Sequence, residues 1–312
     1  MTLPPVDRVA VTTVVDNSVD ILRADEKVAR RWSVARARKI ADLRAEHGLA
    51  HHVEVTRGGE TARIAFDFGL TPGAMTHNFR ELGLDAGAID ALALSHGHSD
   101  HFGGLLGFLS VHRRQMRPDL RFYGHPNHYV ARWFERDGDR VSLGRLDRGD
   151  VTRWDLDVVD VPEPVVLAEG VLLSGEMRAP EPYEVIPPVM RMEENGALVQ
   201  DTFIGEQTLV AHVRDRGLVV VTSCSHRGIV GICRHAARVS GVAKIHAVIG
   251  GFHLSGLDAE RIDRVVEALR GFEVDYLIPQ HCTGAEALVR LAQRMGRELV
   301  VSSTGSTFTF GG

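Results

Sequence analysis

The chain has 312 residues, of which 44% are hydrophobic and 25% are charged. This length and composition fit one large α/β domain, or two smaller domains, with a substantial hydrophobic core. The 41 acidic and 36 basic residues leave a formal net charge of -5, so we expect neither nucleic acid nor a membrane as a partner. No uninterrupted apolar stretch of the sequence approaches the length that would span a bilayer.

The N-terminus and the cysteines bear on where the protein acts. Met1 to Arg8 contains neither the basic region nor the apolar stretch of a secretory signal. The three cysteines are too few and too unevenly spaced for a disulfide framework in a chain of this length. Cys233, inside a predicted helix, and Cys282, next to His281, are interpreted as structural. These features predict a cytoplasmic protein.

The first third of the chain predicts strands and helices. Val9 to Val15 is a short β-branched run and predicts a strand. Ala24 to Glu46 is rich in Ala, Arg, Lys and Glu with apolar residues at loosely helical spacing, and predicts a helix whose arginines face solvent or form a lid or partner surface. Two strands joined by a turn at Arg57 to Glu60 are expected between His51 and Phe68, followed by a helix from Met75 to Leu82.

A strand from Ile89 to Leu94 leads directly into a histidine-rich run. Gly103 to Gln115 then predicts a helix whose N-terminus faces that run. Short strands alternate with Gly, Pro and charged turns across residues 121–200. The prolines between Pro180 and Pro188 predict a loop longer than packing requires, which is either functional or an irregular surface segment.

In the last third of the chain, three strands each end in a loop that carries a histidine. Because α/β folds present functional groups at strand ends, we expect these loops to converge. We expect two mixed sheets packed face to face with helices outside, in one domain whose halves, roughly 1–150 and 151–312, loosely repeat one another. The strands are Gly217–Thr222 (paired with Thr208–Val213), Ile245–Ile249 and Tyr276–Pro279, the histidines are His226, His253 and His281, and the expected helices are Gly228–Val239 and Ala259–Leu269.

The run Ser95-His96-Gly97-His98-Ser99-Asp100-His101 is the strongest functional signal in the sequence. Imidazole nitrogen and carboxylate oxygen bind ions such as zinc at about 2.0 to 2.2 Å. His96 and His98 lie two residues apart on an extended chain, so both can hold one ion while Asp100 and His101 turn toward a second. The spacing therefore predicts two metal ions.

A site with two metals needs about three protein ligands for each ion and an open position for water. Bound metal lowers the pKa of water from about 15.7 toward about 7, and two ions can hold both the attacking and the leaving oxygen of a substrate. Hydrolysis follows from that arrangement. The candidates for the remaining ligands are His226, His281, Cys224 and His253.

The run from Leu94 to His101 resembles the metallo-β-lactamase superfamily of metal-dependent hydrolases. More narrowly, the chain resembles the subgroup of 7,8-dihydropterin-6-methyl-4-(β-D-ribofuranosyl)aminobenzene-5'-phosphate synthases. The resemblance implies an α/β fold, a four-layer αββα sandwich with the metals at one edge. It is carried by Glu46–Leu49, Phe66–Gly69, Ser95–Gly104, Gly217–Val230, Ile249–Leu254 and Pro279–Gly284.

The resemblance also implies a ligand set for each ion. The superfamily usually supplies a bridging aspartate after the strand that here spans Gly217 to Thr222, and Cys224 occupies about that place. Cys224 is either a zinc ligand at about 2.3 Å or a small buried side chain packed beside the site. We favour Zn2+ for both ions, with Mn2+ and Fe2+ as alternatives. The sets are His96, His98 and His226 for the first metal, and Asp100, His101 and His281 for the second.

Asp100 and His253 are the candidate catalytic residues. His253 could be a ligand, a substrate contact or a proton donor to the leaving group, and we favour a role toward the substrate. Asp67 is expected to orient a ligand histidine through its second ring nitrogen, unless it is only a turn residue. The positions that match pocket residues in the family pattern are Arg227, whose charge would suit a phosphate or carboxylate, Asn17 and Glu184.

Three functions are open at this point. The first is a metal-dependent hydrolase acting on an ester, lactone or phosphoester of a small molecule. The second is the pterin-related synthase of the subgroup, in which the metals would orient a phosphorylated substrate. The third is a metal-binding sensor or redox protein without hydrolytic activity, since fold does not dictate activity. The expected partner is a small-molecule substrate, and a homo-oligomer is compatible with the sequence.

Overall fold

An eight-stranded β-sheet forms one half of the structure, a computed structural model that describes residues 2–34 and 42–312. Its strands are antiparallel from β2 through β18, β1 and β3 to β4, and parallel from β4 to β9. In spatial order they are β2 (Ala29–Arg30), β18 (Thr307–Gly311), β1 (Arg8–Val15), β3 (Ala50–Arg57), β4 (Glu60–Phe66), β5 (Ala91–Ala93), β6 (Arg121–Gly124) and β9 (Asp157–Asp160).

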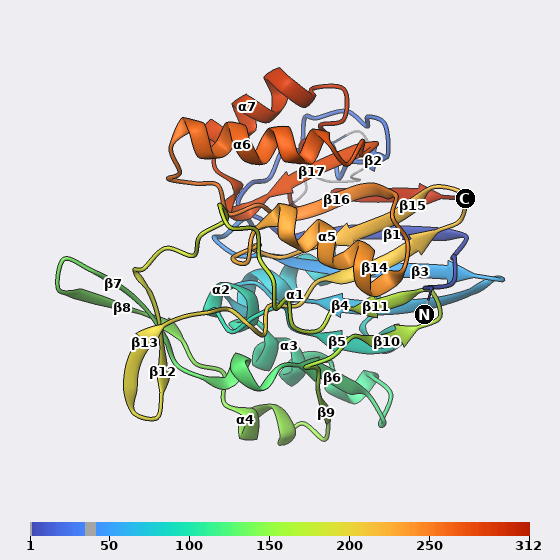
Figure 1. Cartoon of the computed structure of the whole chain (residues 1–312). Helices are drawn as coiled ribbons and strands as arrows, with labels where there is room; N and C mark the ends of the chain where they lie inside the picture. The colour runs from blue at the N-terminus through green and yellow to red at the C-terminus, as the bar shows by residue number, and fades with distance from the viewer. Residues whose placement is uncertain (1, 35–41) are drawn as a thin grey trace.

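A six-stranded sheet faces the first (Figure 1). Its first four strands are antiparallel neighbours and its last three run parallel. The parallel strands therefore end at the same edge, which is where the sequence places its histidines. In spatial order they are β10 (Val165–Ala168), β11 (Val171–Leu173), β14 (Leu209–Val213), β15 (Gly217–Val221), β16 (Ile245–Gly251) and β17 (Tyr276–Gln280).

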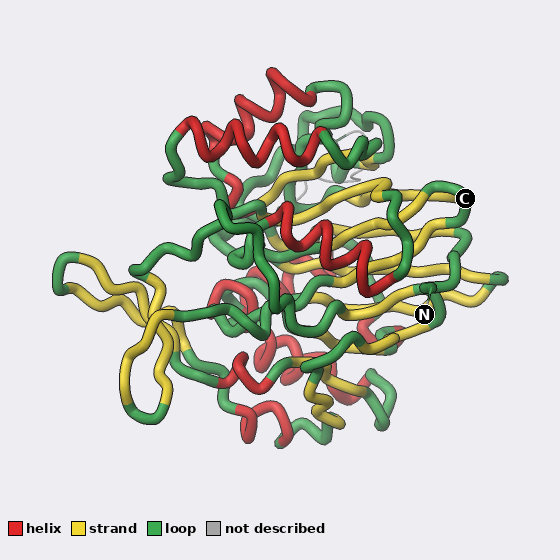
Figure 2. Tube along the Cα trace, in the orientation of Figure 1, coloured by secondary structure: helices red, strands yellow, loops and turns green. Residues whose placement is uncertain are grey.

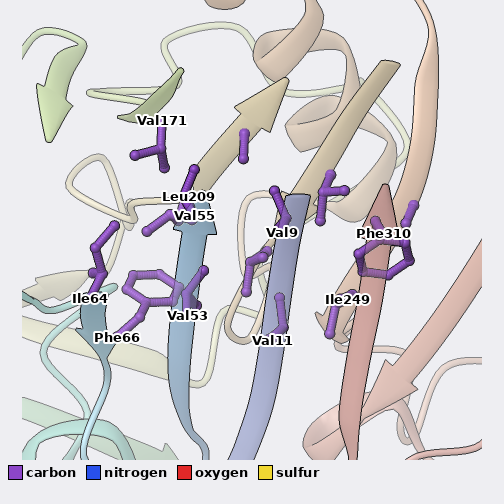
Figure 3. Close-up of a cluster of buried hydrophobic side chains, with 14 of the residues drawn as sticks. Val9, Val11, Val53, Val55, Ile64, Phe66, Val171, Leu209, Ile249 and Phe310 are labelled. Atoms are coloured by element: carbon purple, nitrogen blue, oxygen red, sulfur yellow. The ribbon is translucent and has the colours of Figure 1, made fainter. Parts of the chain in front are cut away.

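The core between the two sheets consists of aliphatic and aromatic side chains (Figure 3). Val9 and Val11 lie two residues apart on β1 and both point into this core, because successive side chains of a strand alternate between its faces. Phe66 of β4 meets them from the same sheet, and Leu209 and Ile249 come from the opposite one. Each of these side chains is fully buried, which stabilises the fold by roughly 1.5 to 3 kcal/mol per residue.

Helices cover the outer faces of both sheets. Buried residues of α5, α6 and α7 pack on the six-stranded sheet, and those of α1 and α3 pack on the eight-stranded sheet. The result is a four-layer αββα sandwich, as expected. The helices are α1 (Pro72–Glu81), α2 (Ser99–Phe102), α3 (Leu105–His112), α4 (Arg148–Thr152), α5 (Ile229–Ser240), α6 (Ala259–Arg270) and α7 (Ala285–Met295), with short 3-10 turns η1 (Ala86–Ala88), η2 (Arg113–Gln115), η3 (Pro126–Tyr129) and η4 (His281–Thr283).

Local sequence explains where these helices begin. Thr71 precedes α1 and its side chain accepts a hydrogen bond from the backbone N–H of Ala74, while Pro72 occupies the first turn. Asp258 caps α6 in the same way, through the N–H of Arg261. Along α6 the buried apolar residues recur at intervals of three and four, which directs one face to the sheet. In the described part of the chain, no helix is both long and apolar enough to cross a membrane.

Two β-hairpins form a small antiparallel sheet that the sequence did not predict. This sheet extends away from the main body (Figures 1 and 2). Its strands lack the regular apolar alternation that identifies buried strands, because they are largely exposed. In spatial order they are β13 (Ala197–Gln200), β12 (Met190–Glu194), β7 (Arg132–Arg136) and β8 (Asp139–Gly144).

The helix predicted over Ala24 to Glu46 is wrong for the residues described, while positions 35–41 lie outside them. Residues 24–34 and 42–46 contain no helix, and Ala29–Arg30 forms β2 against β18 instead. The reason is tertiary: Arg31 is buried and binds Glu26 at 2.7 Å and the Ser306 hydroxyl at 2.9 Å. Those contacts outweigh the intrinsic helix propensity of the segment. The helix expected over Gly103–Gln115 is divided in the structure between α3 and η2, and α2 ends just before it.

Candidate metal centre

The loop after β5 carries the histidine-rich run into α2. His98 is the residue before this helix, and Asp100 and His101 lie in its single turn. A Cβ atom at Gly97 would lie 2.4 Å from both Arg132 Nη1 and the His128 carbonyl oxygen. Only glycine therefore lets the loop pass at this point.

His96, His98 and His226 meet as one group, with their ligand atoms within 4.8 Å of one another. The two Nε2 atoms of His96 and His226 are 3.3 Å apart. A tetrahedral ion with bonds of about 2.0 to 2.1 Å would hold its nitrogen ligands about 3.3 Å apart, so the spacing fits zinc. Burial and the neighbouring imidazoles lower the pKa of all three well below its usual value, which keeps their nitrogen lone pairs available.

Two further observations support a cation in this group. His98 Nε2 is buried and has no hydrogen-bond partner among the described residues. An unsatisfied buried polar atom costs about 1 to 3 kcal/mol, which a ligated ion would offset. Ser95 fixes which nitrogen of His96 carries the proton. Its hydroxyl donates its one proton to Asp67 Oδ2 at 2.7 Å, so it can only accept from His96 Nδ1 at 2.9 Å. His96 therefore carries its proton on Nδ1 and turns the Nε2 lone pair toward the group.

Asp100, His101 and His281 converge beside the first group. Asp100 Oδ2 lies 3.5 Å from His101 Nε2 and 3.2 Å from His281 Nε2. Burial lowers the pKa of His101, but Asp100 and Asp67 outweigh it and raise that pKa to about 10. This preference for a positive charge is what a divalent cation would satisfy. The residues of both implied ligand sets are thus brought together, and their roles as ligands remain predictions.

Asp67 orients His101, as the sequence analysis proposed. Its Oδ2 accepts a hydrogen bond from His101 Nδ1 at 2.9 Å and another from the Ser223 hydroxyl at 2.5 Å. Its Oδ1 accepts from the Ser95 N–H at 2.7 Å. Asp67 is fully buried and has a φ of 61°, a strained value for a residue with a side chain. The carboxylate therefore leaves Nε2 as the free nitrogen of His101.

Asn17 has a comparable relation to His281. Its Oδ1 accepts from His281 Nδ1 at 3.0 Å, and its Nδ2 donates to the His281 carbonyl oxygen at 3.1 Å. The carboxylate of Asp16 accepts from the His281 N–H at 3.0 Å. His281 itself has a φ of 47°. The structure thus places Asn17 where it positions a histidine, and a contact between Asn17 and the substrate remains a prediction.

Cys224 lies between the two histidine groups. Its Sγ is 3.2 Å from His101 Nε2, and it belongs with His96 and His101 to a set whose ligand atoms are within 4.8 Å of one another. The side chain is 3% exposed, which suits both a ligand and a packed thiol. Burial, Cys282 and Asp100 raise the pKa of the Cys224 thiol well above its usual value.

Three residues at the centre were not predicted as part of it. His47 Nε2 lies 3.5 Å from Asp100 Oδ2, and its ring is 4.7 Å from that of His281. Cys282, which the sequence predicts to be structural, lies with Cys224 and His253 in another potential ligand set. Glu206 accepts from the backbone N–H groups of His226 and Arg227, and burial raises its pKa to about 7. The motif Glu46 to Leu49 was the only sequence signal for His47, and Glu206 had none.

Arg227 and Glu184 hold the loops around the centre. Arg227 donates from Nη1 to the Thr202 carbonyl oxygen at 2.6 Å and from Nη2 to that of Met177. Glu184 accepts from the N–H groups of Val230 and Gly231 in the first turn of α5, both at 2.9 Å. These contacts occupy both Nη atoms of Arg227 and both carboxylate oxygens of Glu184, whereas Arg227 Nε is buried without a hydrogen-bond partner among the described residues. Substrate contacts by either residue remain predictions.

His253 stands beside the first histidine group. Its ring is 4.3 Å from that of His226, and its φ is 48°. It also lines a pocket that opens against the centre. This position is compatible with each of the roles considered above, as a ligand, a substrate contact or a proton donor.

Comparisons with known proteins show the family of this chain. The family model of the metallo-beta-lactamase superfamily matches residues 56–179. The 7,8-dihydropterin-6-methyl-4-(beta-D-ribofuranosyl)-aminobenzene-5'-phosphate synthase of Methanocaldococcus jannaschii is 32% identical over 249 residues, which cover 78% of this chain and 83% of that protein. An uncharacterized protein of the same organism is 27% identical over 254 residues, covering 80% and 88% of the two chains.

A solved structure shows the same fold. It is that of a metal-dependent hydrolase of the beta-lactamase superfamily, which aligns with a TM-score of 0.74 at 24% identity and covers 97% of this chain and 100% of that one. The length of the match includes both sheets and their outer helices. Together with the identity to the synthase, it shows that this chain belongs to the metallo-beta-lactamase superfamily.

Proposed function

We propose that the protein is a hydrolase that uses two divalent metal ions, with Zn2+ favoured, to cleave an ester, lactone or phosphoester of a small molecule. The observation that carries the proposal is the convergence of two adjoining ligand sets at one sheet edge. His96, His98 and His226 form the first. Asp100 joins His101 and His281 in the second, through contacts of 3.5 and 3.2 Å.

The protein's own residues orient this site. When bound, divalent ions lower the pKa of water and stabilise negative charge that develops on oxygen. Ser95, Asp67 and Asn17 each bind the Nδ1 side of a histidine and so direct Nε2 toward the centre. His253 lies beside His226 and lines the neighbouring pocket, which supports a role at the reacting end of the substrate, as a substrate contact or as a metal ligand.

A pocket beside the centre supports a small-molecule substrate. His226 and His253 line this pocket, and its charged side chains are Arg261 and Glu184. Most of the remaining wall is apolar, so a ligand with a polar reacting group and an apolar body would bind there. A phosphorylated molecule would place its charge near the two histidines or near Arg261. The apolar and aromatic wall residues are Tyr183, Val185, Pro187, Phe252, Leu254, Leu257 and Val265.

A second candidate is the pterin-related synthase reaction. The observation in its favour is the 32% identity to the synthase of Methanocaldococcus jannaschii over most of both chains. The same centre would then orient two substrates for bond formation instead of activating water. Location in the cytoplasm and assembly into a homo-oligomer remain predictions for either function.

Metal analysis and a substrate panel test the proposal. Purified protein is reconstituted with zinc, manganese or iron and assayed with p-nitrophenyl phosphate, bis-p-nitrophenyl phosphate, p-nitrophenyl acetate and a lactone. We expect metal-dependent turnover, and we expect His98→Ala and Asp100→Ala each to lose metal and activity. His77→Ala is the control, because His77 lies on α1 and binds the Asp42 carbonyl oxygen away from the centre.

Two results would contradict the hydrolase. Absence of any bound transition metal after reconstitution would remove the basis of both candidate functions. The synthase would be favoured by two results together. The protein would bind metal without turning over any of these substrates, and it would bind a 7,8-dihydropterin only when metal is present, as measured by the fluorescence of the pterin.

A further inference from the structure

Two of the three cysteines meet at the metal centre with a histidine. Cys224, His253 and Cys282 come from the loops that follow β15, β16 and β17, which are parallel neighbours in the six-stranded sheet. One ligand atom of each lies within 4.8 Å of those of the other two. The third cysteine, Cys233, is fully buried in α5 and belongs to the core between α5 and the sheet.

The backbone makes room for this contact. A Cβ atom at Gly251 would lie 2.6 Å from Cys282 Sγ and 2.6 Å from the Ser223 carbonyl oxygen. Glycine at this position therefore allows Cys282 to approach the Cys224 backbone, where its thiol donates to the carbonyl oxygen at 3.4 Å. His253 follows with a φ of 48°, a left-handed conformation that costs about 1 to 3 kcal/mol for a residue with a side chain. Strain of this kind persists where the surrounding structure holds a side chain in a required place.

The donor set suits a soft or borderline metal ion. Two thiolates and one imidazole bind zinc in known catalytic sites, with about 2.3 Å to sulfur and about 2.0 to 2.1 Å to nitrogen, and leave a fourth position open. Sulfur ligands around a tetrahedral ion of that size lie about 3.8 Å apart, which the observed spread of ligand atoms can accommodate with small shifts. His253 Nδ1 is buried without a hydrogen-bond partner among the residues described.

We propose that Cys224, His253 and Cys282 form a thiolate-containing metal-binding set next to the histidine groups. Cys224 is shared with the group of His96 and His101, so the set extends the proposed metal centre and rests on it. Because sulfur ligands favour zinc over harder ions such as Mn2+, the set makes the centre selective for zinc. Cys282 is thereby a metal ligand.

Cobalt substitution tests this assignment by spectroscopy, without an activity assay. Protein kept under a phosphine reductant is stripped of metal with a chelator and titrated with Co2+. Histidine and carboxylate ligands give visible d–d absorption, whereas thiolate ligands add a charge-transfer band in the near ultraviolet. We expect both in the wild type, and we expect Cys224→Ala and Cys282→Ala each to reduce the near-ultraviolet band about twofold, because each removes one of two thiolates.

The chain supplies a matched control. Cys233→Ala removes a buried thiol that takes no part in the set, so its near-ultraviolet band should equal that of the wild type. Circular dichroism verifies that each variant is folded. If a variant fails to fold, the wild-type spectrum still decides the matter, because visible absorption with no near-ultraviolet band would overturn the proposal. The proposal would also be overturned if Cys224→Ala abolished the near-ultraviolet band while Cys282→Ala left it unchanged. Absence of any cobalt spectrum would instead contradict the proposed metal centre as a whole.

Discussion

Replacing Asp67 with asparagine should weaken metal binding through the tautomer of one histidine. The Asp67 carboxylate accepts the Nδ1 proton of His101 at 2.9 Å in a fully buried position. Because the backbone N–H of Ser95 donates to Oδ1, an asparagine would keep its oxygen there and place its amide nitrogen at the Oδ2 position. That nitrogen would donate to His101 Nδ1 and so force the imidazole proton onto Nε2. Nε2 would then have no lone pair for a metal ion.

The magnitude follows from the position of Asp67 behind a ligand histidine. Substitution of such an orienting carboxylate typically reduces metal affinity about 10- to 100-fold, which corresponds to about 1.4 to 2.8 kcal/mol. Stability without metal should also fall. An amide nitrogen at the Oδ2 position cannot accept from the Ser95 and Ser223 hydroxyls as the carboxylate does, and an unsatisfied buried donor costs about 1 to 3 kcal/mol.

Competition with a chromophoric chelator measures the zinc affinity of Asp67→Asn, and urea unfolding of the metal-free protein measures its stability. Asp275→Asn is a matched control, since Asp275 Oδ2 contacts His246 Nδ1 at 2.6 Å outside the potential ligand sets. It removes the same kind of pair and should leave zinc affinity unchanged. Wild-type affinity, within about twofold, in Asp67→Asn would refute the tautomer argument.

Two further predictions concern the loops around the centre. Gly97→Ala should lower the midpoint of thermal unfolding and reduce bound zinc, because its Cβ would lie 2.4 Å from Arg132 Nη1 and from the His128 carbonyl oxygen. Gly73→Ala in α1 is the control: its Cβ would have its nearest neighbour at 3.6 Å, so this variant should raise the midpoint. An equal midpoint in both variants would contradict the prediction. Burial raises the pKa of Glu184 from 4.5 to about 7, so the folded state holds the Glu184 proton more tightly than the unfolded state does. The contribution of Glu184 to the free energy of unfolding should therefore fall as pH rises from about 4.5 to about 7, by about 3 kcal/mol at most. Glu184→Gln should remove that fall. Urea unfolding at about pH 5 and about pH 7.5 tests this, because the free energy of unfolding should differ less between the two pH values in the variant than in the wild type.

Short-range pattern predicted the elements that build the sandwich. Strands β1, β15, β16 and β17 are β-branched or apolar runs bounded by turn residues, and that signal is local. It failed for residues 24–34 and 42–46, where the buried contacts of Arg31 with Glu26 and Ser306 replace the helix that composition favours. It also missed the projecting sheet, whose exposed strands have no buried face to impose alternation.

The sequence by itself determined that residues of the types that bind metal cluster after one predicted strand, because His96, His98, Asp100 and His101 lie within six positions of one chain segment. Only the tertiary structure decided which distant residues complete each set. Cys282 lies 58 residues from Cys224 along the chain, yet its thiol reaches the Cys224 carbonyl oxygen, since parallel strands bring their ends to one edge regardless of the residues between them. The same holds for Asn17 and His281, 264 positions apart, because contacts between sheets depend on packing and not on spacing.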